Sequence, residues 1–173
     1  GRVDSSELVA KVEGLLQGLN IQTENLFATG SENLGPVQWK ILARRVEELT
    51  KSKDVDGVVV THGTDTLEEA SFFLDLVCKP SKPVVLTAAM RPATALSADG
   101  PANLYQAILA AASPHLKGHG ILVVMNGTVI PGWQAIKTDS AALESFCAYP
   151  NGIIGRISGE RLIVSSESCP SPL

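Results

Sequence analysis

Side chains that could carry out chemistry are concentrated in the loop Thr61-His62-Gly63-Thr64-Asp65-Thr66. This loop follows an apolar run and precedes an amphipathic stretch, so its hydroxyls and its carboxylate gather at a predicted helix N-terminus. Backbone N–H groups and the helix dipole favour an anion or a developing oxyanion at such a position. Simple helix capping by Thr64 or Asp65 accounts for the same pattern, so the residues alone favour neither interpretation.

Two further loops are candidates for function. The segment from Met90 to Pro101 has twelve residues with no periodicity, and loops of that length inside a compact domain tend to be functional. Residues 126–140 contain Lys137, which its neighbours alone would assign to the surface. His115 and His119 lie among glycine and proline, which predicts a loop and no metal site. The chain lacks the glycine-rich motifs of nucleotide-binding proteins and the GxSxG motif of serine hydrolases.

Alternating helices and strands must position these loops. We expect helices over residues 5–18, 36–49, 65–77 and 102–112, and strands over residues 21–28, 58–60, 83–88 and 121–125. This alternation predicts an α/β fold: a parallel sheet with helices on both faces, in a flavodoxin- or Rossmann-like three-layer arrangement. The chain then ends in a β-hairpin over residues 153–164. We expect one domain over residues 1–164, followed by a Ser/Pro-rich linker or tail over residues 165–173.

The composition excludes several classes of protein. With 45% hydrophobic residues over 173 positions, the chain can form a core without disulfides or a metal. Its 14 Lys and Arg against 18 Asp and Glu leave no basic stripe, so nucleic acid is not an expected partner. No apolar run approaches the ~20 residues that span a membrane, and no signal peptide is visible. The three cysteines are widely spaced, which predicts free thiols.

Taken in order, the loop motifs resemble those of the bacterial L-asparaginase family, in its type II (asparaginase/glutaminase) branch. The similarity runs in register from about Gly1 to Val164. Its motifs are Thr61-His62-Gly63-Thr64-Asp65-Thr66 with Glu68-Glu69, Pro83-Val84-Val85, Ala88-Ala89-Met90-Arg91-Pro92, Ser97-Ala98-Asp99-Gly100-Pro101 and Asn103-Leu104.

The resemblance implies a catalytic role for three residues. Thr64 matches the family's second catalytic threonine, Asp65 matches the aspartate that holds the substrate α-amino group, and Lys137 completes the Thr-Lys-Asp triad. A threonine hydroxyl is a poor nucleophile and needs a base. A lysine amine can be that base only in its neutral form. The implied reaction uses neither a metal nor a cofactor.

The resemblance also implies a substrate-binding set. Ser31 and Glu32 match the pair that binds the α-carboxylate and α-amino groups of the substrate, together with Asp65. Ala89 matches the alanine whose backbone carbonyl receives the side-chain amide. The expected substrate is L-asparagine, which would be hydrolysed to L-aspartate and ammonia, and L-glutamine is an open second substrate.

The chain also departs from the family pattern. Family members begin with a strand that supplies a nucleophilic threonine and a loop with a catalytic tyrosine, and they end in a smaller C-terminal domain. The sequence lacks all three, so the predicted domain is incomplete at its N-terminus and we expect this chain alone to be inactive. The segment before Lys137, residues 133–136, is also less polar than is usual in the family.

Other functions, the assembly and the compartment remain open. One alternative is a non-catalytic amino-acid-binding or assembly module derived from the same fold. An amidotransferase subunit is disfavoured, because nothing resembles a basic surface for tRNA. By resemblance, the protein would be a homo-oligomer, a tetramer built as a dimer of dimers. Its location would be periplasmic by resemblance to type II members, with a cytoplasmic location as the alternative.

Overall fold

The computed structural model describes residues 4–165, which form two sheets and their flanking helices. The larger sheet has six strands in the order β1-β2-β3-β4-β7-β8. Its strands are β1 (Val58–Thr61), β2 (Val84–Thr87), β3 (Ile121–Met125), β4 (Thr128–Pro131), β7 (Gly155–Ser158) and β8 (Arg161–Val164). The second sheet pairs β5 (Ala135–Lys137) with β6 (Phe146–Ala148).

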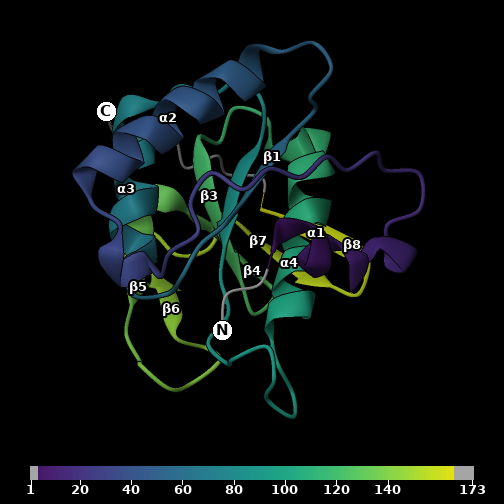
Figure 1. The fold of residues 1–173 in the computed structure, drawn as a ribbon, viewed down its shortest axis with the longest axis vertical. Coiled ribbons are helices and arrows are strands. Elements are labelled where there is room, and N and C mark those ends of the chain that lie inside the picture. The colour runs from purple at the N-terminus through teal and green to yellow at the C-terminus, as the bar shows by residue number, and fades with distance from the viewer. Residues whose placement is uncertain (1–3, 166–173) are drawn as a thin grey trace.

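Helices cover both faces of the large sheet, which confirms the predicted α/β class (Figure 1). The α-helices are α1 (Ser5–Ala10), α2 (Pro36–Lys51), α3 (Leu67–Val77) and α4 (Gly100–Ala112). Single 3₁₀ turns cover Glu13–Leu15, Ser31–Asn33, Pro114–Leu116 and Gly132–Gln134. Val84 and Leu86 of β2 pack with α2 and α3, and Val85 between them packs with α4. This alternation buries β2 on both faces, as a continuous apolar run predicts.

The sheet is parallel over β1, β2 and β3 and antiparallel beyond them. The direction changes at Asn126-Gly127, where both residues have positive φ angles, of 46° and 74°. Such a pair is typical of the two-residue turn that joins antiparallel strands, so β4 returns directly beside β3. The predicted C-terminal hairpin is confirmed as β7 and β8, joined by a turn in which Gly159 has a φ of 59°.

Two predictions near the N-terminus are wrong. The helix expected over residues 5–18 is α1 followed by the separate 3₁₀ turn, because the chain leaves α-helical geometry around Lys11 and Val12. Its apolar side still packs as expected, since Val12 and Leu16 contact Leu104 and Ile108 of α4.

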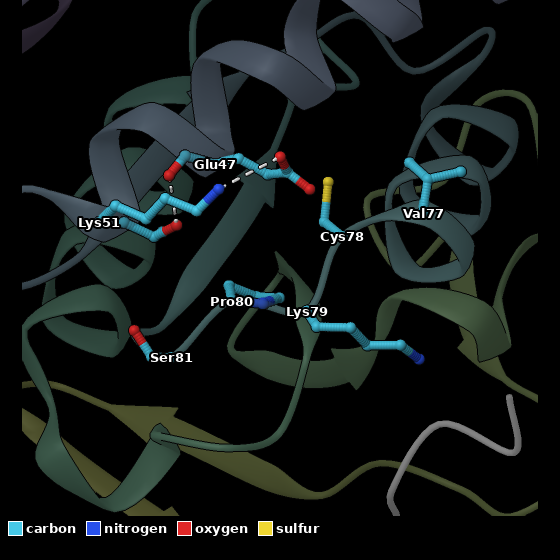
Figure 2. Close-up of a pocket in the computed structure, with 8 residues that line it drawn as sticks. Glu47, Lys51, Val77, Cys78, Lys79, Pro80 and Ser81 are labelled. Carbon is cyan, nitrogen blue, oxygen red and sulfur yellow. Dashed lines mark hydrogen bonds and ion pairs between the residues drawn. The ribbon is translucent and has the colours of Figure 1, made fainter.

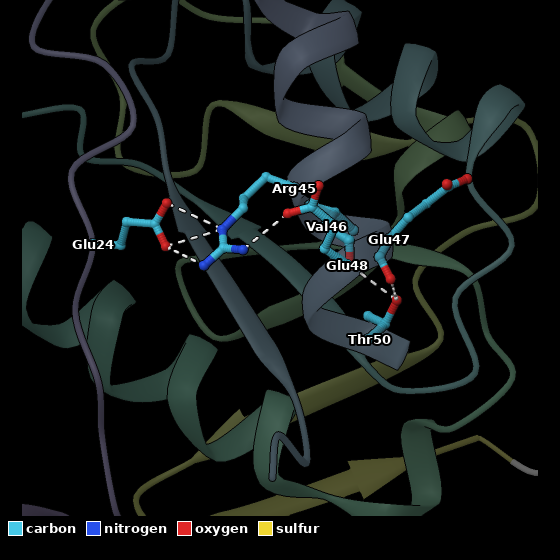
Figure 3. A network of polar contacts seen from close by, with 6 residues as sticks. All are labelled: Glu24, Arg45, Val46, Glu47, Glu48 and Thr50. Atoms are coloured by element: carbon cyan, nitrogen blue, oxygen red, sulfur yellow. Dashed lines mark hydrogen bonds and ion pairs between the residues drawn. The ribbon is translucent and has the colours of Figure 1, made fainter. Parts of the chain in front are cut away.

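The second error is the strand expected over residues 21–28, which is irregular in the structure. A strand needs a neighbouring backbone to accept its hydrogen bonds, and within residues 4–165 no strand pairs with this segment. Side chains hold it instead: Arg45 of α2 forms hydrogen bonds of 2.8–3.1 Å with Glu24, and its guanidinium also pairs with Glu48 at 2.9 Å (Figure 3).

The structure tests in part the predictions about the cysteines, the C-terminal tail and membrane-spanning segments. Cys78 and Cys147 are free thiols as predicted, whereas Cys169 and nearly all of the predicted tail over residues 165–173 lie outside the described residues. Among the helices of residues 4–165, none combines the length and the apolar character needed to cross a membrane.

Candidate active site

The loop that carries Thr64 and Asp65 lies at the carboxyl end of β1. The backbone N–H of His62 donates to the carbonyl of Thr87 at 2.8 Å, which continues the parallel ladder with β2 one step past the strands. Helix α3 begins at Leu67 with Thr66 in the N-cap position, and no side-chain capping bond forms there. Helix capping therefore does not account for the presence of Thr64 and Asp65.

The structure brings the three predicted catalytic residues together. The Nζ of Lys137 donates to Thr64 Oγ1 at 3.0 Å and lies 3.5 Å from Asp65 Oδ1. The lysine side chain is 19% exposed, whereas that of Asp65 is 63% exposed. A shielded amine thus touches a hydroxyl, and beside it an open carboxylate faces solvent, where it can pair with a cationic group of a ligand.

Ser31 is packed against the same loop. The residue is only 4% exposed, and its backbone carbonyl accepts a hydrogen bond of 2.8 Å from Thr66 Oγ1. Gly63 leaves room for this contact, because a Cβ at Gly63 would overlap Ser31 Oγ and lie 2.8 Å from Ser31 Cβ. Ser31 is therefore held against Gly63 and Thr66, the residues that flank Thr64 and Asp65.

Glu32 is placed differently from the other predicted binding residues. Its carboxylate folds back over Gly30 and accepts a hydrogen bond of 3.1 Å from Asn33 Nδ2. The residue is exposed, and the hydrogen bonds of its carboxylate are local. Ser31 thus packs against the loop that carries Asp65, whereas the Glu32 carboxylate is turned toward its own neighbours.

Ala89 follows the carboxyl end of β2, at a turn that the buried Asn103 and the half-buried Asp99 hold in place. Asn103 of α4 donates to the carbonyl of Ala88 at 3.0 Å and to Asp99 at 3.1 Å. The Asp99 carboxylate accepts the backbone N–H groups of residues 90 and 91, each at 2.9 Å. The predicted functional loop over residues 90–101 is thereby closed on itself beside Ala89.

Two polar residues in this region belong to the predicted motif but were given no role in the site from the sequence. The carboxylate of Glu68, on the first turn of α3, accepts the backbone N–H of Lys137. Its only sequence signal is an acidic residue one helical turn after Thr64. His62 donates through Nδ1 to the carbonyl of Gly63 at 2.8 Å, and its Nε2 is buried without a hydrogen bond. Burial lowers the pKa of His62 below its usual 6.5.

No described feature suggests a metal centre. Across residues 4–165, no group of three or more His, Cys, Asp or Glu side chains is arranged to hold a metal ion. His115 lies in the 3₁₀ turn Pro114–Leu116 and not in the predicted loop.

A hollow of about 260 Å³ lies at the other end of α3 from Thr64 (Figure 2). Its lining includes Glu47 and Lys51, which pair at 3.7 Å, and the buried thiol of Cys78. The residues that line it come from the last turns of α2 and α3 and the segment after α3, so it is separate from the cluster around Lys137.

Comparisons with known proteins place the chain in a family. The profile described as "Asparaginase, N-terminal" matches residues 1–169. The chain is 41% identical over 160 residues to L-asparaginase 2 of Bacillus subtilis (strain 168), covering 92% of this chain and 43% of that protein. It is 43% identical over 156 residues to the glutaminase-asparaginase of Pseudomonas fluorescens biotype A, covering 90% of this chain and 43% of that one.

A third relative is the probable periplasmic L-asparaginase of Haemophilus influenzae (strain Rd), 40% identical over 162 residues, which cover 94% of this chain and 46% of the relative. The chain thus spans less than half the length of each of these relatives. The match to the family profile nevertheless extends over most of its residues, and the predicted resemblance is confirmed: the chain belongs to the asparaginase family, in the part described as its N-terminal region.

Proposed function

We propose that this chain provides the Thr64, Asp65 and Lys137 cluster of an L-asparagine amidohydrolase, which also accepts L-glutamine. The observation that carries the proposal is the 3.0 Å contact between Lys137 Nζ and Thr64 Oγ1 beside the open carboxylate of Asp65. The names of the relatives, L-asparaginase 2 and glutaminase-asparaginase, support the choice of substrates.

In the proposed reaction, Thr64 and Lys137 handle the proton. The attacking hydroxyl, from a threonine or from water, loses its proton through Thr64 Oγ1 to the Lys137 amine as it adds to the amide carbon. The same proton then passes to the leaving nitrogen, so that ammonia departs and the C–N bond breaks. Where a threonine attacks, this leaves an ester between that threonine and the substrate acyl group, and a water that loses its proton by the same route hydrolyses the ester and restores the hydroxyl. By either route one water is consumed, and its oxygen ends in the carboxylate of the product.

Binding of the amino-acid end of the substrate fixes the reactive amide. Asp65, exposed beside Thr64 and Lys137, pairs with the α-ammonium group, and the Ser31 hydroxyl donates to the α-carboxylate. Glu32 joins the α-ammonium only after its carboxylate leaves Gly30, and the Ala89 carbonyl accepts from the side-chain amide. Holding both charged ends of the substrate places the amide carbon against the attacking oxygen.

The test is ammonia release from L-asparagine and L-glutamine by the full product of the gene. Replacing the amine in Lys137→Met should lower kcat/KM by about 100-fold or more, the usual contribution of a positioned base. Lys117→Met, at an exposed lysine, is the matched control and should match the wild type. L-aspartate should still bind to Lys137→Met in calorimetry, because Asp65 and Ser31 remain. A Lys137→Met protein with more than a tenth of wild-type activity would contradict the proposal.

In this proposal, the full gene product assembles as a homotetramer. This step rests on the resemblance to the type II asparaginases. Sedimentation velocity of the full gene product should give a mass of four chains, and a monomer at assay concentration would contradict it.

The proposed location is the periplasm. The printed name of the Haemophilus influenzae relative, a probable periplasmic L-asparaginase, supports this location. Fractionation of the native host should recover the protein with a periplasmic marker, and recovery with a cytosolic marker would instead support the cytoplasmic alternative.

A further inference from the structure

We infer that Glu68 is a positioning residue for Lys137, and that it acts together with Ser71 to clamp the segment that carries this lysine onto α3. The inference rests on the proposed function, because it assigns a purpose to the placement of Lys137. Both residues lie in the first half of α3, directly after Thr64 and Asp65.

Ser71 and Glu68 bind the two ends of one short segment, residues 132–137. Ser71 is fully buried, and its hydroxyl lies 3.0 Å from the carbonyl of Gly132 and 3.0 Å from the carbonyl of Glu68. Glu68 is half-buried, and its carboxylate accepts the backbone N–H of Lys137. The 3₁₀ turn Gly132–Gln134 and strand β5 lie between these two contacts.

Strand β5 pairs with β6 along one edge and with no described strand along the other edge. Helix α3 supplies a hydrogen-bond acceptor at this second edge. On one side it pairs with β6, where the neighbouring N–H of Thr138 donates to the carbonyl of Ser145 at 2.8 Å. Successive N–H groups of a strand point to opposite sides, so the N–H of Lys137 points away from β6. Glu68 supplies the acceptor there, and a carboxylate acceptor makes the stronger, charge-assisted hydrogen bond.

Comparison with the neighbouring Glu69 distinguishes this role from the general effect of acidic residues at a helix N-terminus. Both glutamates lie in the first turn of α3, where negative charge is favourable in any helix. Glu69 is exposed, whereas Glu68 reaches a strand 69 residues further along the chain. If the two glutamates act only through the helix dipole, replacing either one should have the same effect. If Glu68 holds the Lys137 segment in place, only its replacement should affect the position of Lys137.

The consequence for catalysis follows from the distances at the lysine. The Nζ of Lys137 lies 3.0 Å from Thr64 Oγ1, and the loop that bears Thr64 runs directly into the helix that bears Glu68. Glu68 therefore ties the lysine backbone to the same element that fixes the hydroxyl. A displacement of about 1 Å in such a pair can cost about 100-fold in rate.

The experiment compares Glu68→Ala, Glu68→Gln and Glu69→Ala in the full gene product. Glu68→Ala should lower kcat by about tenfold to 100-fold and leave KM within about twofold, because positioning of the base is lost and substrate anchors remain. Glu68→Gln keeps an oxygen acceptor and should stay within about threefold of the wild-type kcat. Glu69→Ala should match the wild type in both constants.

Hydrogen exchange provides a measure that does not require activity. The amide of Lys137, followed by NMR, should exchange at least about tenfold faster in Glu68→Ala than in the wild type, and at the wild-type rate in Glu69→Ala. In Glu68→Gln it should exchange no more than about threefold faster, because a neutral acceptor makes a weaker hydrogen bond than a carboxylate. If the wild-type protein releases no ammonia, the proposed function fails, and the exchange rates alone still decide the clamp.

Two outcomes would overturn the inference: equal exchange of the Lys137 amide in Glu68→Ala and the wild type, or equal kcat losses in Glu68→Ala and Glu68→Gln. If circular dichroism shows that Glu68→Ala does not fold, Glu68→Asp takes its place. That variant keeps the charge but is one methylene too short, so faster exchange at Lys137 supports the clamp and unchanged exchange refutes it.

Discussion

A methyl group added at Gly63 should force apart the two loops that form the candidate site. The Cβ of Gly63→Ala would overlap Ser31 Oγ and lie 2.8 Å from Ser31 Cβ, whereas carbon atoms in contact normally stay about 3.5–4.0 Å apart. The two loops must therefore separate by about 1 Å at this point. Such a shift would strain the 2.8 Å hydrogen bond between Thr66 Oγ1 and the carbonyl of Ser31.

The change in the free energy of unfolding of Gly63→Ala is the difference between two opposing effects. Overpacking of this kind costs about 1–3 kcal/mol, while the reduced freedom of the unfolded chain after a Gly→Ala change returns about 0.4–1 kcal/mol. Gly63 has no positive φ angle, so the alanine itself is not strained. We expect a net loss of about 1–2 kcal/mol, which lowers the Tm of a domain of this size by roughly 2–8 °C.

Thermal unfolding of a double-mutant cycle measures the effect. Ser31→Gly removes the two side-chain atoms that the new methyl group would overlap, so the double variant Ser31→Gly/Gly63→Ala should recover most of the loss, with a coupling energy of about 1–2 kcal/mol. Gly14→Ala is the matched control, because a Cβ there meets no atom within 4 Å. If Gly63→Ala unfolds at the same temperature as Gly14→Ala, the packing of Ser31 against the loop is refuted.

Three further predictions concern residues around the core. Asn103→Leu removes hydrogen bonds of 3.0, 3.1 and 3.0 Å that link the ends of β2, α4 and β3, and should cost about 2–4 kcal/mol in urea unfolding; no change in midpoint would contradict this. Burial raises the pKa of Cys78 to about 11, so roughly one thiol in a thousand is ionised at pH 8. A disulfide reagent followed by peptide mass spectrometry should therefore label exposed Cys147 first, and equal rates would refute the burial. Burial also lowers the pKa of His62 below its usual 6.5, so the unfolded chain binds the proton at a higher pH than the folded one. The free energy of unfolding should fall as the pH drops below about 6.5, less steeply in His62→Gln, and parallel curves would contradict this.

The parallel part of the fold was predictable because its strands are buried on both faces. Runs such as residues 58–60 and 121–125 consist of apolar residues without alternation, and this pattern is typical of strands in a parallel sheet that helices cover on both sides. The segment over residues 21–28 has polar residues at positions 22–25 between its apolar ends, and it has no paired neighbour among residues 4–165. Strand pairing cannot be read from one segment alone. Strands β5 and β6 have three residues each, too few for a periodicity to emerge.

Residues of the candidate site could be predicted only where they belong to a recognisable sequence motif. Thr64 and Asp65 follow a recognisable strand, but the approach of Lys137 to Thr64 spans 73 positions and came from the resemblance. Glu68 was missed for a physical reason: acidic residues in the first turn of a helix are common, because they complement the helix dipole. Nothing in the sequence distinguishes Glu68 from Glu69, and only the fold places one of them against a distant backbone N–H.

The long span between Thr64 and Lys137 also bears on how the protein folds. Closing a loop of 73 residues costs roughly 4 kcal/mol of chain entropy, and the contact it brings is a hydrogen bond at a partly exposed site. We expect this contact to form after β2, β3 and β4, which lie between the two residues in the sequence, and therefore late in folding. Any signal from the Lys137 amine, such as its reactivity toward an acylating reagent, therefore reports completion of the fold.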